Sequence, residues 1–142
     1  MTAEFPLAVH ALVYLVHKDG CVSSLELADN ICTNPARVRK VMTRLHHAGL
    51  IEAARGQGSG YKALPDTGSL RLSTVLEALS EEPLSMNWRS GDIDRECLIS
   101  SGMGLVMDGI YASLNKECMS LLSQMTIGEI VERLFKNKED SK

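Results

Sequence analysis

Six cationic side chains lie close together in the middle of the chain, between Thr33 and Lys62. This segment contains one acidic residue, Glu52, so it carries a local charge of +5 within a chain of net charge −3. The remaining residues therefore carry −8. Local charge sets the field that a phosphate backbone meets, so this cluster favours contact with nucleic acid. The cations are Arg37, Arg39, Lys40, Arg44, Arg55 and Lys62.

The cysteines and histidines are the other side chains that could do chemistry. Cys97 follows Arg95 near an expected helix start, and both features lower the pKa of a thiol, so Cys97 is a candidate redox sensor. The alternative is a half-buried structural cysteine. Zinc sites use closer pairs of ligands, so we predict no metal. We also predict no cofactor and no enzymatic activity. The set comprises Cys21, Cys32, Cys97, Cys118, His10, His17, His46 and His47, of which Cys118 is predicted to lie in a core.

The composition indicates one compact, mainly helical protein with or without an appended element. The chain has 142 residues, of which 44% are hydrophobic and only 4% aromatic, so aliphatic side chains must fill its core. No apolar run reaches the roughly 20 residues of a membrane span. No secretory leader is visible, and we expect a cytoplasmic protein with reduced cysteines.

Three helices are expected to position the cations. Apolar residues at helical spacing predict a buried first helix over residues 5–18. Ser23-Ser-Leu-Glu26 is a capping box that begins a short second helix. Asn34 as N-cap and Pro35 at the first helical position begin a third, which runs to about His47. Its apolar stripe is Val38, Val41, Met42 and Leu45, with cations on the opposite side.

A hairpin and three further helices complete the predicted order. Strands over residues 50–54 and 61–64 flank a tip that contains three glycines. The stripe Val106, Ile110, Leu114, Cys118 and Leu121 predicts one long helix. The helices are expected over residues 73–80, 100–124 and 126–135, with a turn-rich linker over residues 81–95.

This order of elements predicts a winged helix-turn-helix: mainly α with a small β-hairpin, followed by a long C-terminal dimerisation helix. The second helix braces the third, whose outward cations suit the major groove of DNA. Glycine at the hairpin tip lets the backbone approach phosphate or the minor groove. We assign residues 1–80 to DNA binding, 81–99 to the linker and 100–142 to a helical dimerisation region.

The same segment resembles the Rrf2 family of transcription regulators. The resemblance rests on Asn34-Pro-Ala-Arg-Val-Arg-Lys40, Thr43-Arg-Leu45, Ala48-Gly-Leu-Ile51 and Arg55-Gly-Gln-Gly-Ser-Gly-Tyr61. It implies a homodimer, more often a repressor than an activator, on a palindromic operator in double-stranded DNA. By position, the resemblance implies DNA contacts through Asn34, Ala36, Arg37, Arg39, Lys40, Thr43, Arg55, Ser59 and Tyr61.

The resemblance also bears on iron. Family members with an iron–sulfur cluster carry three closely spaced cysteines after the linker, whereas this chain has only Cys97 there, with Cys118 21 residues further on. The resemblance therefore implies no cluster of that pattern, and a site assembled across a dimer is the alternative.

Three alternatives remain open at this point. A winged-helix module that docks proteins and does not bind DNA would suit the net charge of −3. An unidentified small-molecule effector is an alternative signal to thiol oxidation. Met103, Met107, Met119 and Met125 are interpreted as a dimer core, with a ligand pocket near the linker as the alternative. Trp88 is interpreted as filling the gap between the DNA-binding unit and the long helix.

Overall fold

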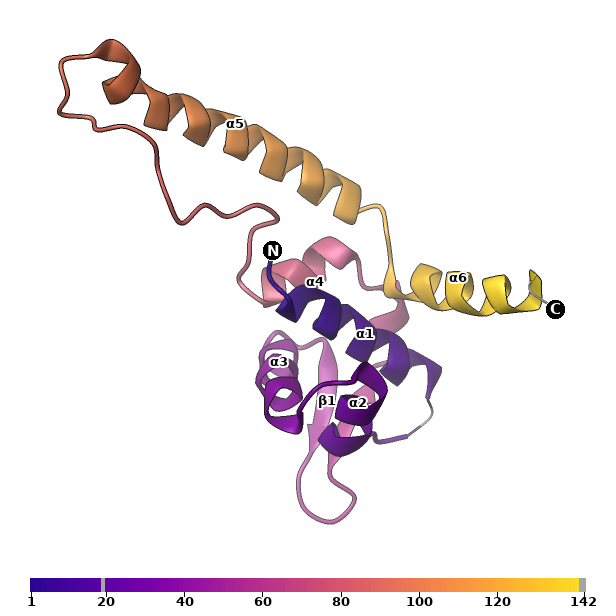
Figure 1. The fold of residues 1–142 in the computed structure, drawn as a ribbon. Coiled ribbons are helices and arrows are strands. Elements are labelled where there is room, and N and C mark those ends of the chain that lie inside the picture. Colours follow the sequence, from indigo (N-terminus) through magenta and orange to yellow (C-terminus); the bar gives the residue numbers. More distant parts are fainter. Residues whose placement is uncertain (19, 141–142) are drawn as a thin grey trace.

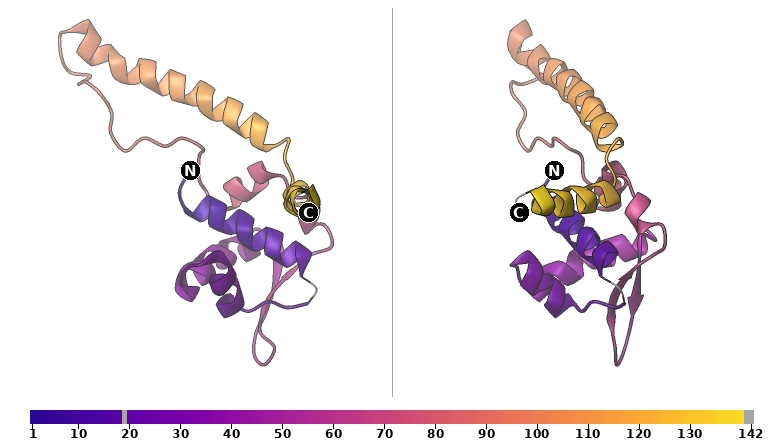
Figure 2. Two further views of the ribbon diagram at one scale, coloured as in Figure 1. Left: turned by 45° about the vertical axis from the view of Figure 1, so that its right-hand side comes forward. Right: turned by 90° about the vertical axis from the view of Figure 1, so that its right-hand side faces the viewer.

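One long helix, α5 (Leu98–Leu122), projects from a body built by the other elements (Figures 1 and 2). The computed structural model describes residues 1–18 and 20–140. The mainly helical class with a two-stranded hairpin is confirmed. The body comprises α1 (Glu4–His17), α2 (Ser24–Ile31), α3 (Pro35–His47), β1 (Ile51–Ala54), β2 (Gly60–Ala63), η1 (Thr67–Ser69), α4 (Leu72–Ala78) and α6 (Ile127–Asp140).

Side-chain caps fix the starts of α2, α3 and α6; within the described residues, the α2 cap consists of the Ser23 half of the predicted capping box. The Ser23 hydroxyl accepts the backbone N–H of Glu26 at 3.1 Å, and Asn34 Oδ1 accepts that of Arg37 at 2.8 Å. Thr126 and Glu129 exchange two such bonds at 3.2 Å, which completes a capping box. These bonds satisfy N–H groups that a helix start otherwise leaves without a partner.

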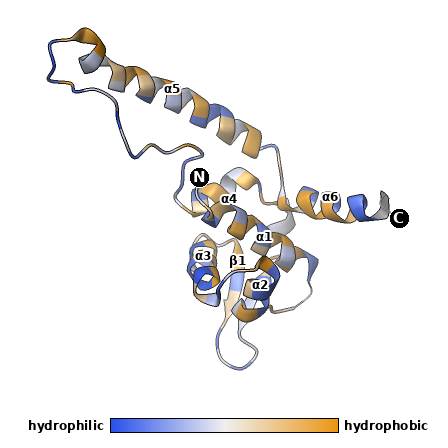
Figure 3. Cartoon of the chain, viewed as in Figure 1, coloured by the Kyte–Doolittle hydropathy of each residue, from blue (hydrophilic) through white to orange (hydrophobic). Residues whose placement is uncertain are grey.

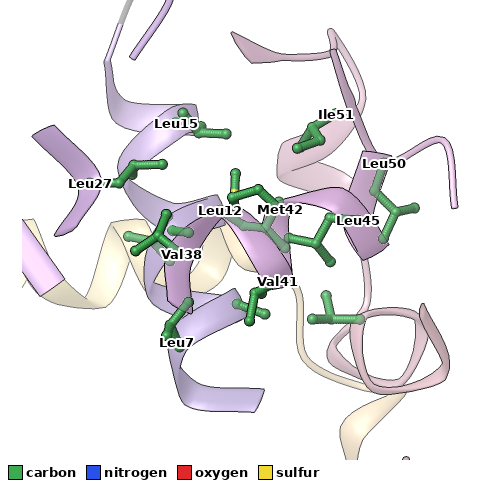
Figure 4. Close-up of a cluster of buried hydrophobic side chains, with 14 of the residues drawn as sticks. Leu7, Leu12, Leu15, Leu27, Val38, Val41, Met42, Leu45, Leu50 and Ile51 are labelled. Atoms are coloured by element: carbon green, nitrogen blue, oxygen red, sulfur yellow. The ribbon is translucent and has the colours of Figure 1, made fainter. Parts of the chain in front are cut away.

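The core of the body lies between α1 and α3 (Figure 4). Val38, Val41, Met42 and Leu45 of α3 are fully buried, as their spacing predicts, and Leu12 of α1 lies among them. Burial of each such side chain stabilises the fold by roughly 1.5–3 kcal/mol. Because one side of α3 is held in this core, its other side has a fixed direction. The remaining buried residues of α1 are Phe5, Leu7, Ala8, Ala11, Val13 and Leu15.

The hairpin pairs β1 with β2 in an antiparallel register from Ile51–Ala63 to Ala54–Gly60. A third segment joins its edge, because Val22 and Tyr61 exchange two backbone hydrogen bonds of 2.8 Å. Gly60 permits this approach: its φ is +153°, and a Cβ there would lie 2.5 Å from the Val22 carbonyl oxygen. The hairpin is thereby attached to the connection between α1 and α2.

The helix α5 is mostly exposed or half-buried within one chain, and Gly104 is its one buried residue. In Figure 3 apolar residues recur along its whole length. The linker runs out beside α5, and α6 then returns to pack against α1, where the His17 and Phe135 rings stack at 4.4 Å. The division at residues 80 and 100 stays a prediction; residues 141–142 of its last part lie outside the described residues.

Three details of the prediction are wrong. The helix α4 starts at Leu72 after Arg71, which provides no side-chain cap bond, and α6 extends five residues beyond Phe135. Trp88 is 72% exposed and fills no gap. Cys118 is half-buried within one chain, so its predicted place in a core depends on a second copy and stays a prediction.

Candidate DNA-binding surface

The outward face of α3 carries Ala36, Lys40, Thr43 and His47. All four are exposed, and helical spacing places them opposite the buried stripe. Arg39 and Arg37 flank this face on its two sides and are also exposed. A helix held by one face, with small, polar and cationic groups on the other, has the form that enters a major groove.

The cations of α3 do not have equal freedom. Lys40 Nζ lies 3.3 Å from one carboxylate oxygen of Glu4, and Arg44 lies 3.5 Å from the other. Arg44 also donates to the Leu79 carbonyl oxygen at 2.9 Å, at the C-terminal end of α4. Arg44 therefore ties α3 to α1 and α4, whereas Arg37 has no such partner among the contacts resolved in residues 1–18 and 20–140.

Arg39 is where three elements of the surface meet. Its guanidinium donates to the Ser24 hydroxyl of α2 at 3.4 Å. Its charge also acts on Tyr61 in β2: burial raises the pKa of the Tyr61 phenol, and the nearby Arg39 opposes that rise. Arg39 and Tyr61, both predicted as contact residues, are thus brought together. The Thr43 hydroxyl, one turn on, donates to the Arg39 carbonyl oxygen at 2.8 Å.

The wing extends from the body beside α3. Residues 55–59 are all exposed, and Arg55 and Ser59 stand at the two ends of this tip. The Ser59 N–H donates to the Gly56 carbonyl oxygen at 2.9 Å, which closes the turn. The hairpin therefore offers one cation and exposed backbone at its far end, where Figure 1 draws the loop furthest from α5.

The predicted set needs two additions and one adjustment. Asn34 Oδ1 accepts the hydrogen bond that caps α3, so the amide N–H₂ of Asn34 is the group that remains for a contact with DNA. Ser24 and His47 also lie on the surface, although neither belongs to the predicted set of DNA contacts. His47 follows Thr43 by four residues and Lys40 by seven, so helical spacing alone could have indicated it. Ser24 becomes a candidate only through its contact with Arg39, which no local pattern reveals.

Cys97 lies far from this surface, at the start of α5. It is exposed, and the backbone N–H groups of Ser100 and Ile99 lower the pKa of its thiol. The open first turn of a helix stabilises a thiolate in this way. Cys21 and Cys32 are exposed as well, so exposure alone does not distinguish Cys97.

Comparison with known proteins decides the family. The family model of Rrf2, described as an iron-dependent transcriptional regulator, matches residues 1–133. The chain belongs to the Rrf2 family. It is 37% identical over 79 residues to the HTH-type transcriptional regulator IscR of Cereibacter sphaeroides, an alignment that covers 54% of this chain and 51% of that relative. The chain thus spans about half the length of that relative.

Longer alignments cover more of the chain, and solved structures share its fold. The IscR of Klebsiella pneumoniae is 23% identical over 135 residues, which cover 92% of this chain and 78% of the relative. A putative transcriptional regulator from Lactobacillus plantarum superimposes with a TM-score of 0.80 at 21% identity over 100% of both chains. The structure of CymR, the global cysteine regulator of B. subtilis, gives a TM-score of 0.67 at 14% identity over 94% of this chain and 96% of that one.

The family assignment makes this Rrf2 protein a DNA-binding transcriptional regulator, not an enzyme. It thereby argues against the protein-docking module without DNA affinity. Among the helices of the described residues, none has the length and hydropathy to cross a membrane.

The described residues of one chain do not form a set of ligands for the iron that the family description mentions. In residues 1–18 and 20–140 no three His, Cys, Asp or Glu side chains gather as metal ligands. Cys97 and Cys118 lie at opposite ends of α5, about 30 Å apart at the usual rise of a helix. A cluster normally needs four protein ligands, which the described residues of one chain do not bring together.

Proposed function

We propose that this Rrf2 protein is a sequence-specific repressor that acts as a homodimer on a palindromic operator. The observation that carries the proposal is the outward face of α3, with Ala36, Lys40 and Thr43 exposed beside the Arg55 wing. Two copies would place two such helices in successive major grooves, about one helical turn apart.

Separate roles are proposed for the contact residues. Ala36, Arg37, Lys40 and Thr43 face base edges, and an arginine paired with guanine contributes roughly 1–3 kcal/mol of discrimination. Arg55 and Ser59 contact phosphate or the minor groove at the wing, where sequence matters less. Asn34, Arg39 and Tyr61 lie at the rim, and Arg39 holds its position through Ser24.

A titration of labelled duplex by fluorescence anisotropy tests these roles. Arg37→Ala is expected to reduce the preference for operator over random DNA by about tenfold or more. Arg55→Ala is expected to weaken both duplexes alike. Arg133→Ala removes the same side chain from the exposed surface of α6 and serves as the matched control. If Arg37→Ala and Arg55→Ala bind both duplexes as the control does, the assigned surface is wrong.

Dimerisation through α5 is proposed because this helix exposes a continuous apolar stripe. Ile99, Val106, Ile110, Leu114 and Leu121 recur on one face and are 44–72% exposed. Apolar patches of this length usually mark an interface. The proposed division into residues 1–80, 81–99 and 100–142 assigns this role to the last part, with α5 as its contact element.

The mass in solution tests the dimer. Ile110→Asp places a charge in the stripe and is expected to shift the dimer toward monomer by at least tenfold in dissociation constant. Ala112→Asp adds the same charge on the exposed opposite side of α5 and is the control. Analytical ultracentrifugation separates the two. A dimer that survives Ile110→Asp as well as Ala112→Asp would place the interface elsewhere.

Thiol modification at Cys97 is the proposed signal, supported by its exposure and its lowered pKa. Hydrogen peroxide would oxidise the thiolate to sulfenic acid and release hydroxide. We expect oxidant to reduce operator affinity in the native protein and to have less effect on Cys97→Ser. Equal responses of the two proteins would remove Cys97 from the mechanism. Colourless purified protein would agree with the proposed absence of a cluster.

The sign of regulation is tested in cells. A reporter gene placed behind the operator is expected to be more active when the regulator is deleted than when it is present. Lower activity on deletion would make the protein an activator, and the DNA-binding assignment would be unaffected.

A further inference from the structure

A pocket of about 590 Å³ lies between the linker and α5, away from the DNA-binding surface. Thioethers and aromatic rings dominate its walls: Met86 and Trp88 from the linker, and Met103, Met107 and Tyr111 from α5. Its volume lies within the range of small-molecule sites. Flexible methionines adapt to ligands of varied shape.

The linker wall of this pocket is fastened to α5 at both ends. On one side, Leu84 exchanges two hydrogen bonds, of 2.8 and 3.0 Å, with the amide of Asn115. On the other, the Asp92 N–H donates to the Ser100 carbonyl oxygen at 3.0 Å. The segment between these two attachments, which includes Trp88, therefore lies across the pocket and is fixed to α5 at both ends.

One ion pair crosses the pocket between its two attachments. Arg89 donates to both carboxylate oxygens of Asp108, at 2.6 and 3.3 Å. Its guanidinium lies close over Gly104, where a Cβ would stand 2.8 Å from the Arg89 Cζ. Both members of the pair are about half exposed, and exposed pairs contribute little stability. Asp108 can therefore exchange this cation for another.

The negative charge around the pocket favours a cationic ligand over an anionic one. Residues 81–122 contain seven acidic and three basic side chains, a net charge of −4. An anion would meet that field, and its one local cation, Arg89, is already paired. A cation would gain from the field, from the Asp108 carboxylate and from the faces of Trp88 and Tyr111.

We propose that this pocket binds lipophilic organic cations, such as aryl-substituted ammonium or phosphonium compounds. The ligand cation takes the place of the Arg89 guanidinium beside Asp108, and its apolar groups contact the thioethers and rings. This names the chemical class of the small-molecule effector.

A route leads from the pocket to the DNA-binding surface; this second step rests on the proposed function. The start of the linker is held by the N-terminal amine, which donates to the carbonyl oxygens of Glu82 and Pro83, and by the Thr2–Glu81 contact. Just before the linker, the Leu79 carbonyl accepts from Arg44 of α3. Release of Arg89 loosens the linker at its centre, and the change reaches α3 through these contacts.

Trp88 is the sole tryptophan of the chain, so its fluorescence reports occupancy of the pocket directly. We would titrate the full-length protein, without DNA, with tetraphenylphosphonium and with tetraphenylborate, which has a similar shape and the opposite charge. The expected result is saturable quenching by the cation, at roughly tenfold higher affinity than any effect of the anion. Isothermal titration calorimetry gives the same comparison without the fluorophore.

Variants test the assigned carboxylate. Asp108→Asn is expected to weaken binding of the cation by about fivefold or more, whereas Glu132→Gln, which removes the same charge from an exposed site on α6, leaves that binding nearly unchanged. Equal binding of both probes, binding of neither, or equal effects of the two variants would overturn the proposal. The DNA titration is then repeated with bound cation: altered operator affinity supports the route through Arg44, and unaltered affinity refutes that route alone.

Discussion

Thr67 provides the sharpest test of how the wing is held to the body. Its side chain is fully buried, and its hydroxyl makes two hydrogen bonds. It accepts the Leu64 N–H at 2.8 Å, just after β2, and donates to the Leu50 carbonyl oxygen at 3.1 Å, just before β1. One hydroxyl thus closes the base of the hairpin from both strands.

Replacement of this hydroxyl by a methyl group has a cost that the geometry sets. Thr67→Val keeps the shape of the side chain and leaves the Leu64 N–H and the Leu50 carbonyl without this partner. An unsatisfied buried group costs about 1–3 kcal/mol. Leu64 is only half-buried, so water recovers part of its loss, and we expect about 2–3 kcal/mol in total. Thr67→Ser keeps both bonds, loses one methyl group and should cost about 1 kcal/mol.

Thermal unfolding followed by circular dichroism distinguishes the two variants. For a chain of this size each kcal/mol lowers Tm by about 3–4 °C. Thr67→Val is therefore expected to melt roughly 6–12 °C below the native protein and Thr67→Ser roughly 3–4 °C below it. Protein concentration must be equal throughout, because a dimer makes Tm depend on concentration. If Thr67→Val melts at or above Thr67→Ser, the two hydrogen bonds do not hold the wing base.

Three further predictions concern the hairpin edge, the thiol and the cations of α3. Gly60→Ala is expected to break the pairing of Val22 with the hairpin and to cost about 1–3 kcal/mol in urea unfolding; an unchanged midpoint would contradict the 2.5 Å approach. Because the pKa of its thiol is lowered, Cys97 is expected to react with iodoacetamide faster than the exposed Cys21 at pH values below the pKa of an ordinary thiol. Equal rates of modification, measured by mass spectrometry, would refute this. Glu4→Gln is expected to tighten operator binding about two- to fivefold at low salt only; loss of affinity would show that Glu4 serves mainly to position Arg44.

The elements that sequence predicted well are those fixed by local chemistry. The N-cap of α3 is such a case, because Asn34 and Pro35 each carry a mechanism that needs no distant partner. The buried stripe of α3 follows from spacing in the same way. Two strand-like segments around a tip with three glycines predict the hairpin, whereas its attachment through Val22 is not predictable in this way, since that contact joins segments far apart in the chain.

The features that the sequence did not predict depend on contacts between distant segments of the chain. Arg44 looks like any outward cation of α3 in the sequence, but Glu4 and the Leu79 carbonyl bind it. Its place in a polar linker suggests that Trp88 fills a gap between the DNA-binding unit and the long helix; in the structure Trp88 is exposed and lies beside methionine side chains of the linker and α5. A pattern gives the face on which a residue lies, and only the packing of distant segments decides what that face meets.

The helix α5 shows where this limit matters for function. Periodicity along α5 predicts an apolar stripe equally well for a core helix and for an interface helix. The structure separates the two cases, because Ile110 and Leu114 remain 45% and 44% exposed while Val38 of α3 is fully buried. Since burial of such side chains is what stabilises a helix of this kind in water, a stripe left open by its own chain supports the proposed dimer. In that dimer a second copy supplies an identical stripe, and the pairing would also set the spacing of the two α3 helices. Contact along α5 and recognition of a two-fold operator would therefore depend on the same geometry.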